Sequence, residues 1–232
     1  MVRVSRKLFA LVVGSTLVAL LGACGPSGAE KAQEHVKKGA ALAAEGKHEP
    51  AIAEFKKAAE LNRDALDPQI LMGDSYRAMK KYDEALAAYG AAKKINRASP
   101  RPHLASALAY LDRGDVEKAS GEADQATEVD PGNLAGMILQ GRVSMLPRRL
   151  PDGSTGVPQA ILDRARLNLE TAVQKAPDNV EARYWLARLY DQIGEKDRAL
   201  AAWTKAGELA GTKPEHAKMA PEIAEAIARL KR

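Results

Sequence analysis

The sequence predicts an all-α protein, an α-solenoid of five helix-turn-helix repeats that ends in a C-terminal capping helix. Two columns of alanine recur at spacings of 34, 34, 46 and 34 residues, and a third column of small residues follows the same 34-residue period. Aromatic residues make up only 4% of the chain while alanine is abundant, which favours closely packed helices over a β-sandwich. The three columns are Ala51, Ala85, Ala119, Ala165 and Ala199; Ala58, Ala92, Ala126, Ala172 and Ala206; and Gly39, Gly73, Ala107, Gly141 and Ala187.

The N-terminus has the pattern of an export signal. Arg3, Arg6 and Lys7 precede an uncharged apolar run over residues 8–21. That run is shorter than the roughly 20 residues that a membrane span needs. Its end, Leu21-Gly22-Ala23-Cys24, resembles a bacterial lipobox, in which the cysteine thiol receives the lipid. We therefore expect residues 1–23 to be a lipoprotein signal peptide and Cys24 to be lipidated; the alternative is a free thiol after a signal anchor.

The residues after Cys24 predict a tether and a location. Gly25-Pro26-Ser27-Gly28 is incompatible with a helix, so residues 24–31 are expected to form a lipidated, flexible tether. Position 25 is not aspartate, and by resemblance to lipoproteins of diderm bacteria this favours the outer membrane over the inner membrane. The resemblance implies that the folded part faces the periplasm.

The repeat columns resemble the tetratricopeptide repeat, a helix-turn-helix unit in which small residues allow the two helices to approach closely. The resemblance implies a right-handed solenoid. Gly46, Gly114 and Gly194 fall between the two helices of their units, where a left-handed residue is useful. The predicted units are residues 32–65, 66–99, 100–133, 134–179 and 180–213, followed by a capping helix over residues 214–232.

Two segments depart from the regular repeat. The 46-residue spacing predicts a 12-residue insertion in the fourth unit, placed at residues 147–158, whose three prolines and two glycines exclude a helix. At the C-terminus, Ile223, Ile227 and Leu230 recur at i, i+4 and i+7. That pattern predicts an amphipathic helix that covers the exposed end of the last unit.

The resemblance also implies where a partner binds, because the first helix of each such unit lines the concave inner surface. The residues at these positions are mainly aliphatic, with arginine and aspartate among them, and such a patch is typical of an interaction site. We expect it to hold a hydrophobic peptide or an amphipathic helix, unless curvature or the insertion already buries the leucines. The candidate groove residues are Ile70, Asp74, Arg77, Leu104, Leu108, Leu111, Ile138, Arg142, Met145, Tyr184 and Arg188.

Several other functions are disfavoured by the residues present. One cysteine and four histidines cannot form a Cys/His zinc cage, and His35 and His103, in the same column of two units, are better explained by packing than by metal binding. No catalytic constellation is visible, so we expect no enzyme activity, cofactor or small-molecule substrate. The formal charge of +5 falls to +2 without residues 1–23, and no basic stripe is left for nucleic acid.

The functional expectation is a non-catalytic, lipid-anchored scaffold that binds an envelope protein or peptide. The combination of lipid anchor and repeats is similar to lipoproteins that assist the assembly of pilus secretins, exopolysaccharide export or surface-protein sorting. The residues do not select one of these pathways or name the client. Two alternatives stay open at this stage: a structural envelope lipoprotein that self-assembles through its repeat faces, and an enzyme that processes peptidoglycan or lipid.

Overall fold

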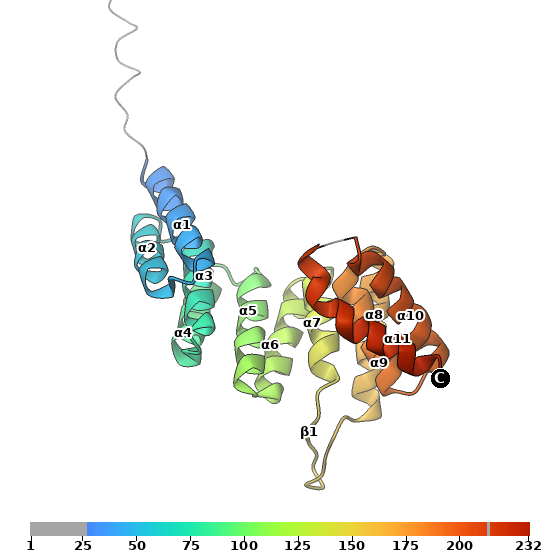
Figure 1. Ribbon diagram of the computed structural model, residues 1–232. Coiled ribbons are helices and arrows are strands. Elements are labelled where there is room, and N and C mark those ends of the chain that lie inside the picture. The colour runs from blue at the N-terminus through green and yellow to red at the C-terminus, as the bar shows by residue number, and fades with distance from the viewer. Residues whose placement is uncertain (1–26, 213) are drawn as a thin grey trace, which may run out of the picture.

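The computed structural model describes residues 27–212 and 214–232, and within these ranges the chain folds into eleven α-helices, a 3-10 helix and a two-stranded hairpin (Figure 1). The predicted signal peptide and Cys24 lie outside the described residues. The elements are α1 Gly28–Ala44, α2 His48–Leu61, α3 Leu66–Ala78, α4 Tyr82–Ile95, α5 Arg101–Arg113, α6 Val116–Val129, α7 Leu134–Ser144, β1 Arg148–Arg149, β2 Thr155–Gly156, α8 Gln159–Lys175, α9 Val180–Gln192, α10 Lys196–Ala210, η1 Pro214–Met219 and α11 Ala220–Leu230.

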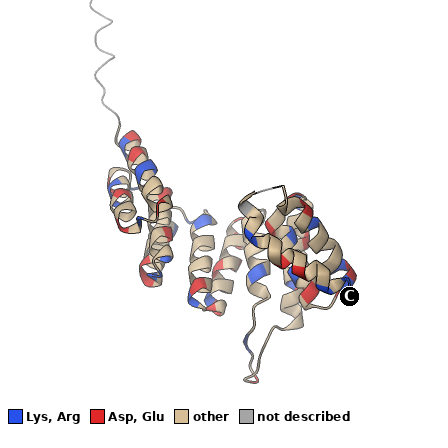
Figure 2. Ribbon diagram, in the orientation of Figure 1, with Lys and Arg blue, Asp and Glu red and all other residues tan. Residues whose placement is uncertain are grey.

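The helices form five consecutive antiparallel hairpins, which confirms the predicted solenoid. The pairs are α1 with α2, α3 with α4, α5 with α6, α7 with α8, and α9 with α10. The second helix of each pair packs on the first helix of the next, and consecutive first helices also contact each other. The first helices therefore form an inner layer that runs through the stack (Figure 1). Acidic and basic residues are interspersed along the helices of both layers (Figure 2).

Each hairpin closes where a small residue of the first helix meets the side chain opposite it. A Cβ atom placed on Gly73 would lie 2.4 Å from a ring carbon of Tyr89, and one on Gly141 would lie 2.4 Å from Leu169. Both large side chains are fully buried. The recurring small residues are therefore a requirement of helix packing, as the period predicts.

The turns between the paired helices need a left-handed residue. Gly46, Gly114 and Gly194 have φ angles of 76°, 87° and 80°, where glycine has no Cβ penalty. The second unit has Lys80 at the equivalent place, with φ of 61°. The second unit thus makes the same turn with a residue that is strained there.

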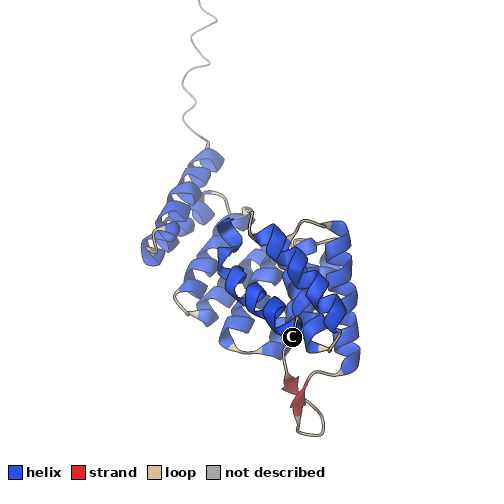
Figure 3. Ribbon diagram, turned by 45° about the vertical axis from the view of Figure 1, so that its right-hand side comes forward, coloured by secondary structure: helices blue, strands red, loops and turns tan. Residues whose placement is uncertain are grey.

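The insertion at residues 147–158 lies between α7 and α8 and contains a short hairpin that the sequence did not predict. β1 and β2 pair antiparallel, with Arg148 opposite Gly156. The Leu150 amide donates to the Ser154 carbonyl at 2.8 Å, and Gly153 takes φ of 84° in the turn. The hairpin projects away from the helices rather than folding back over them (Figure 3).

The first helix begins within the segment that was predicted to be a tether. Residues 24–31 were expected to be flexible, but α1 starts at Gly28 and its first turn includes Glu30. The reason is a capping box: the Glu30 amide donates to the Ser27 hydroxyl at 3.2 Å, and the Ser27 amide donates to the Glu30 carboxylate at 2.6 Å. The tether prediction was therefore wrong for residues 28–31.

The C-terminal segment caps the last unit with a shorter helix than expected. Residues 214–219 form the 3-10 helix η1, and α11 starts only at Ala220. Ile223 is fully buried against α10, and Ile227 and Leu230 pack against the same cluster. The amphipathic pattern thus identified the covering face, while the start of the helix was wrong by six residues.

Within the described residues, no helix has both the length and the apolar character to cross a membrane.

Candidate partner-binding surface

The first helices of the third, fourth and fifth units surround a hollow of about 230 Å³ on the inner layer. Four of the predicted groove residues, Leu111, Arg142, Met145 and Arg188, are brought together there. The lining residues are Leu111 and Asp112 from α5, Arg142, Met145 and Leu146 from α7 and the residues after it, and Trp185, Arg188 and Gln192 from α9. The hollow is thus built from three consecutive units.

Trp185 is the aromatic centre of this hollow. The guanidinium of Arg142 lies 5.1 Å from the centre of its ring, and that of Arg188 lies 5.2 Å away. Tyr184 packs edge-on against the same indole, with ring centres 5.1 Å apart. Gln192 donates to the Met145 carbonyl at 3.1 Å and so joins α9 to the end of α7. Two cations therefore lie within cation–π distance of one aromatic ring that the neighbouring helices hold in place.

The arginines of the inner layer differ in whether a carboxylate of the chain pairs with them. Arg77 donates to Asp112 at 2.8 Å, which joins α3 to α5. Arg188 lies 3.6 Å from Glu222 of α11. In the part of the chain that the structure describes, Arg142 has no carboxylate within ion-pair distance. The positive charge in the hollow is therefore concentrated on Arg142.

Asp74 lies elsewhere, in a second hollow of about 180 Å³ between α1 and α3. It accepts a hydrogen bond of 2.7 Å from the phenol of Tyr89. Burial, together with the negative charge of Asp74, raises the pKa of Tyr89 above its usual range. Ala40, Ala43 and Leu71 contribute the small and apolar part of the lining. The predicted residues of the inner layer are thus divided between separate hollows and do not all line one continuous groove.

Part of the predicted aliphatic surface is already covered within the protein. Ile70, Ile138 and Tyr184 are only 6%, 4% and 6% exposed. Leu104 and Leu108 are half-buried against a cluster that includes Val143. Met145 is likewise 6% exposed. Contacts within and between the units bury these side chains, so the expectation of an open aliphatic groove was wrong for Ile70, Ile138, Met145 and Tyr184.

Four residues that were not predicted from the sequence complete the lining of the hollow. Asp112, Leu146, Trp185 and Gln192 were not predicted as site residues. A sequence signal existed for two of them, because Trp185 and Gln192 lie three residues before and four after Arg188, on the same face of a helix. Only the packing of one unit on the next places Asp112 and Leu146 beside them.

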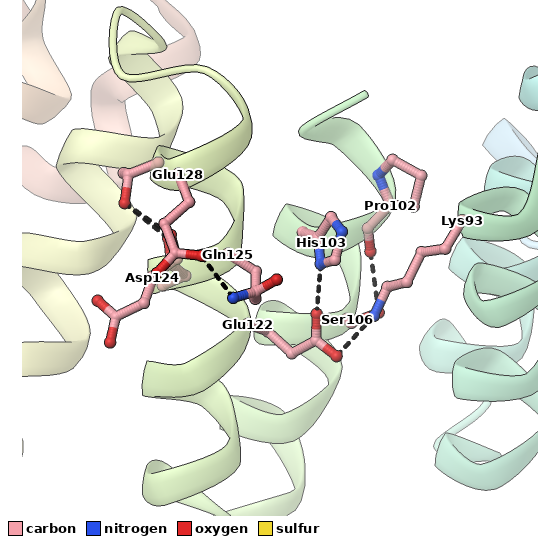
Figure 4. A network of polar contacts seen from close by, with 10 residues as sticks. Lys93, Pro102, His103, Ser106, Glu122, Asp124, Gln125 and Glu128 are labelled. Carbon is pink, nitrogen blue, oxygen red and sulfur yellow. Dashed lines mark hydrogen bonds and ion pairs between the residues drawn. The ribbon is translucent and has the colours of Figure 1, made fainter. Parts of the chain in front are cut away.

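Two histidines form repeated polar contacts between helices. His103 and Lys93 both contact the Glu122 carboxylate, at 2.8 and 2.5 Å, so the contact joins α4, α5 and α6 (Figure 4). His35 makes the equivalent contact with Glu54 at 2.7 Å. Hydrogen bonds from Lys57 and His35 lower the pKa of Glu54 to about 2.

These contacts give the histidine column a role in joining the helices. Across the described ranges, no group of three or more His, Cys, Asp or Glu side chains is placed to hold a metal ion.

Comparison with known proteins gives the family of the repeats. Models described as tetratricopeptide repeat match residues 35–64 and 162–230, and a TPR repeat model matches residues 73–114. No protein of curated function matches the chain.

Solved structures of similar fold share little sequence with the chain. Yeast Tom70 gives a TM-score of 0.70 at 19% identity over 87% of this chain and 39% of that one, so the chain spans about two fifths of Tom70. A thermophilic TPR protein of Thermus thermophilus gives a TM-score of 0.65 at 21% identity, over 85% of this chain and 99% of that one. YrrB, described as a TPR protein with an unusual peptide-binding site, gives a TM-score of 0.54 at 17% identity, over 82% of this chain and 92% of that one. The repeat columns, the helical hairpins and these matches agree: the chain is built from tetratricopeptide repeats.

Proposed function

We propose that this chain is a non-catalytic scaffold of the bacterial cell envelope, anchored in the outer membrane by a lipid on Cys24 and facing the periplasm. Its inner layer binds a segment of an envelope protein during the assembly of a pilus, secretion or exopolysaccharide-export machine. The observation that carries the binding role is the hollow formed by α5, α7 and α9, where an aromatic ring and two cations are accessible from the inner side.

The dimensions and chemistry of the hollow favour a peptide over a small molecule. Its volume of about 230 Å³ is below the roughly 300–1,000 Å³ of typical small-molecule pockets. Tryptophan and arginine are the side chains that most often contribute strongly to protein interfaces. The likeness in fold to YrrB, whose description names a peptide-binding site, supports the same kind of partner.

Photo-crosslinking in intact envelopes tests the binding role. A photoreactive residue at Gln192, which lines the hollow, is expected to crosslink a partner protein that mass spectrometry identifies. The matched control is the same residue at Leu167, which is 65% exposed on α8, outside the hollow. Equal crosslinking from both positions, or none from Gln192, would contradict partner binding at the hollow.

The anchor has a separate test that does not depend on the partner. Replacing the thiol in Cys24→Ala removes the atom that would carry the lipid, so the protein is expected to leave the membrane fraction or to stay as an uncleaved precursor. Labelled palmitate should be incorporated into the wild-type chain and not into the variant. Normal palmitate labelling of Cys24→Ala would refute the anchor.

A further inference from the structure

We propose that the hollow between α5, α7 and α9 recognises an acidic side chain, aspartate or glutamate, at an internal position of the partner segment, with an apolar side chain beside it. This inference rests on the proposed function and names the chemistry of the partner. The carboxylate binds Arg142, and the neighbouring apolar side chain packs on Leu111 and Leu146, which are half-buried in the same hollow.

Charge complementarity is the first argument. Arg142 is half-buried and lines the hollow, yet no carboxylate of the described residues pairs with it. The acidic side chain in the lining, Asp112, already forms an ion pair with Arg77 at 2.8 Å. A cation in partly desolvated surroundings is stabilised when an anion completes its hydrogen bonds. A carboxylate of the partner would therefore supply the ion pair that Arg142 lacks among the described residues.

The contact with Trp185 makes Arg142 a candidate carboxylate site. The guanidinium of Arg142 lies over the Trp185 ring, 5.1 Å from the ring centre. A guanidinium held beside an aromatic ring can still donate N–H groups in its own plane to a carboxylate. Because the indole restrains the arginine beforehand, less side-chain entropy is lost on binding. Lysine cannot offer the same planar pair of donors.

The surroundings select what accompanies the carboxylate. Leu111, Met145, Leu146 and Trp185 supply apolar surface in the same hollow. A volume of about 230 Å³ suits one or two side chains rather than a folded element.

The position of the hollow favours an internal residue over a chain end. The inner layer continues on one side through α3, which contacts α5, and on the other side the capping helix α11 approaches the hollow, where its Glu222 contacts Arg188. A peptide that crosses the hollow therefore meets protein surface before and after the carboxylate.

An oriented peptide library tests the proposal with the full chain purified in detergent. The probe is a mixture of random octapeptides with acetylated N-termini, in two forms, one amidated and one with a free C-terminal carboxylate. We expect the wild-type chain to enrich glutamate or aspartate next to leucine, isoleucine, methionine or phenylalanine, equally in both forms. Binding of an enriched peptide should weaken about ten- to hundredfold in Arg142→Gln, the expected effect of losing a charge-assisted contact.

Two further variants separate recognition from folding. Arg164→Gln removes an exposed arginine on α8 that pairs with Asp124 at 3.0 Å, and it is expected to bind like the wild type. Arg142→Lys keeps the charge without the planar donors and should bind with intermediate affinity. Both variants, and Arg142→Gln, should keep the wild-type helical circular dichroism.

The outcomes that overturn the proposal are distinct from those that overturn the proposed function. No enriched peptide, an unchanged acidic preference in Arg142→Gln, a preference for basic residues, or binding only to peptides with a free carboxylate would each overturn it. If Gln192 still crosslinks a partner in envelopes while the library shows no acidic preference, the scaffold function stands and this inference falls. Failure of both experiments would overturn both.

Discussion

The close approach of helices inside each hairpin makes a quantitative prediction at Gly73. A Cβ atom on Gly73 would lie 2.4, 2.7 and 2.9 Å from three carbons of the Tyr89 ring. That ring is fully buried, and its hydroxyl donates to Asp74 at 2.7 Å, so the ring cannot shift without breaking a contact. Gly73→Ala must therefore separate α3 from α4 or displace the ring. Overpacking of this kind costs about 1–3 kcal/mol.

A second glycine provides the matched control. Gly90 lies within α4, and a Cβ atom there would have no atom within 4 Å. Both substitutions gain about 1 kcal/mol from the higher helix propensity of alanine. That gain cancels when the two variants are compared, so Gly90→Ala should exceed Gly73→Ala in free energy of unfolding by about 1–3 kcal/mol.

Urea unfolding followed by circular dichroism measures this difference. The Gly90→Ala midpoint should lie above that of the wild type, and the Gly73→Ala midpoint below that of Gly90→Ala. Equal midpoints for the two variants would refute the argument that Gly73 is required by the contact with Tyr89.

Three further predictions concern side chains outside the hollow. The hydrogen bond from Lys57 lowers the pKa of Glu54 to about 2, so the ionised carboxylate stabilises the fold above its unfolded pKa of about 4.3. This stabilisation is lost as the pH falls towards 2. Between pH 6 and 2, the urea midpoint of Glu54→Gln should therefore fall less than that of the wild type. Burial and the hydrogen bond to Glu170 raise the pKa of Tyr190 to about 12, so stability should fall between about pH 10 and 12, and thermal melts of Tyr190→Phe should show a smaller fall. Lys80→Gly removes the left-handed strain at φ of 61° and should raise the free energy of unfolding by up to about 1 kcal/mol; a lower urea midpoint would contradict that strain.

The fold followed from the sequence because its determinants repeat. The small residues at Gly73 and Gly141 and the turn at Gly114 each belong to columns that several units share, so every unit supports the same interpretation. Features that occur once were harder to predict. The hairpin in the insertion has no counterpart in another unit, and the start of α1 depends on the single capping box of Ser27 and Glu30.

The candidate site was predictable only in part, since its shape depends on how neighbouring units pack. Family position identified Arg142 and Arg188 as inner-layer residues, and both line the hollow. The position of a residue in the repeat does not show how deeply its side chain is buried. Ile138, for example, is at an inner-layer position but is only 4% exposed. The pairing of Arg77 with Asp112, 35 residues away, was likewise invisible in the sequence.

Hydrogen exchange with and without the captured partner most directly tests the claim that the inner layer is the recognition surface. A bound partner is expected to slow amide exchange in α5, α7 and α9, the helices that line the hollow, and to leave exchange in α6 and α8 unchanged. Slower exchange confined to α6 and α8, with α5, α7 and α9 unaffected, would contradict it.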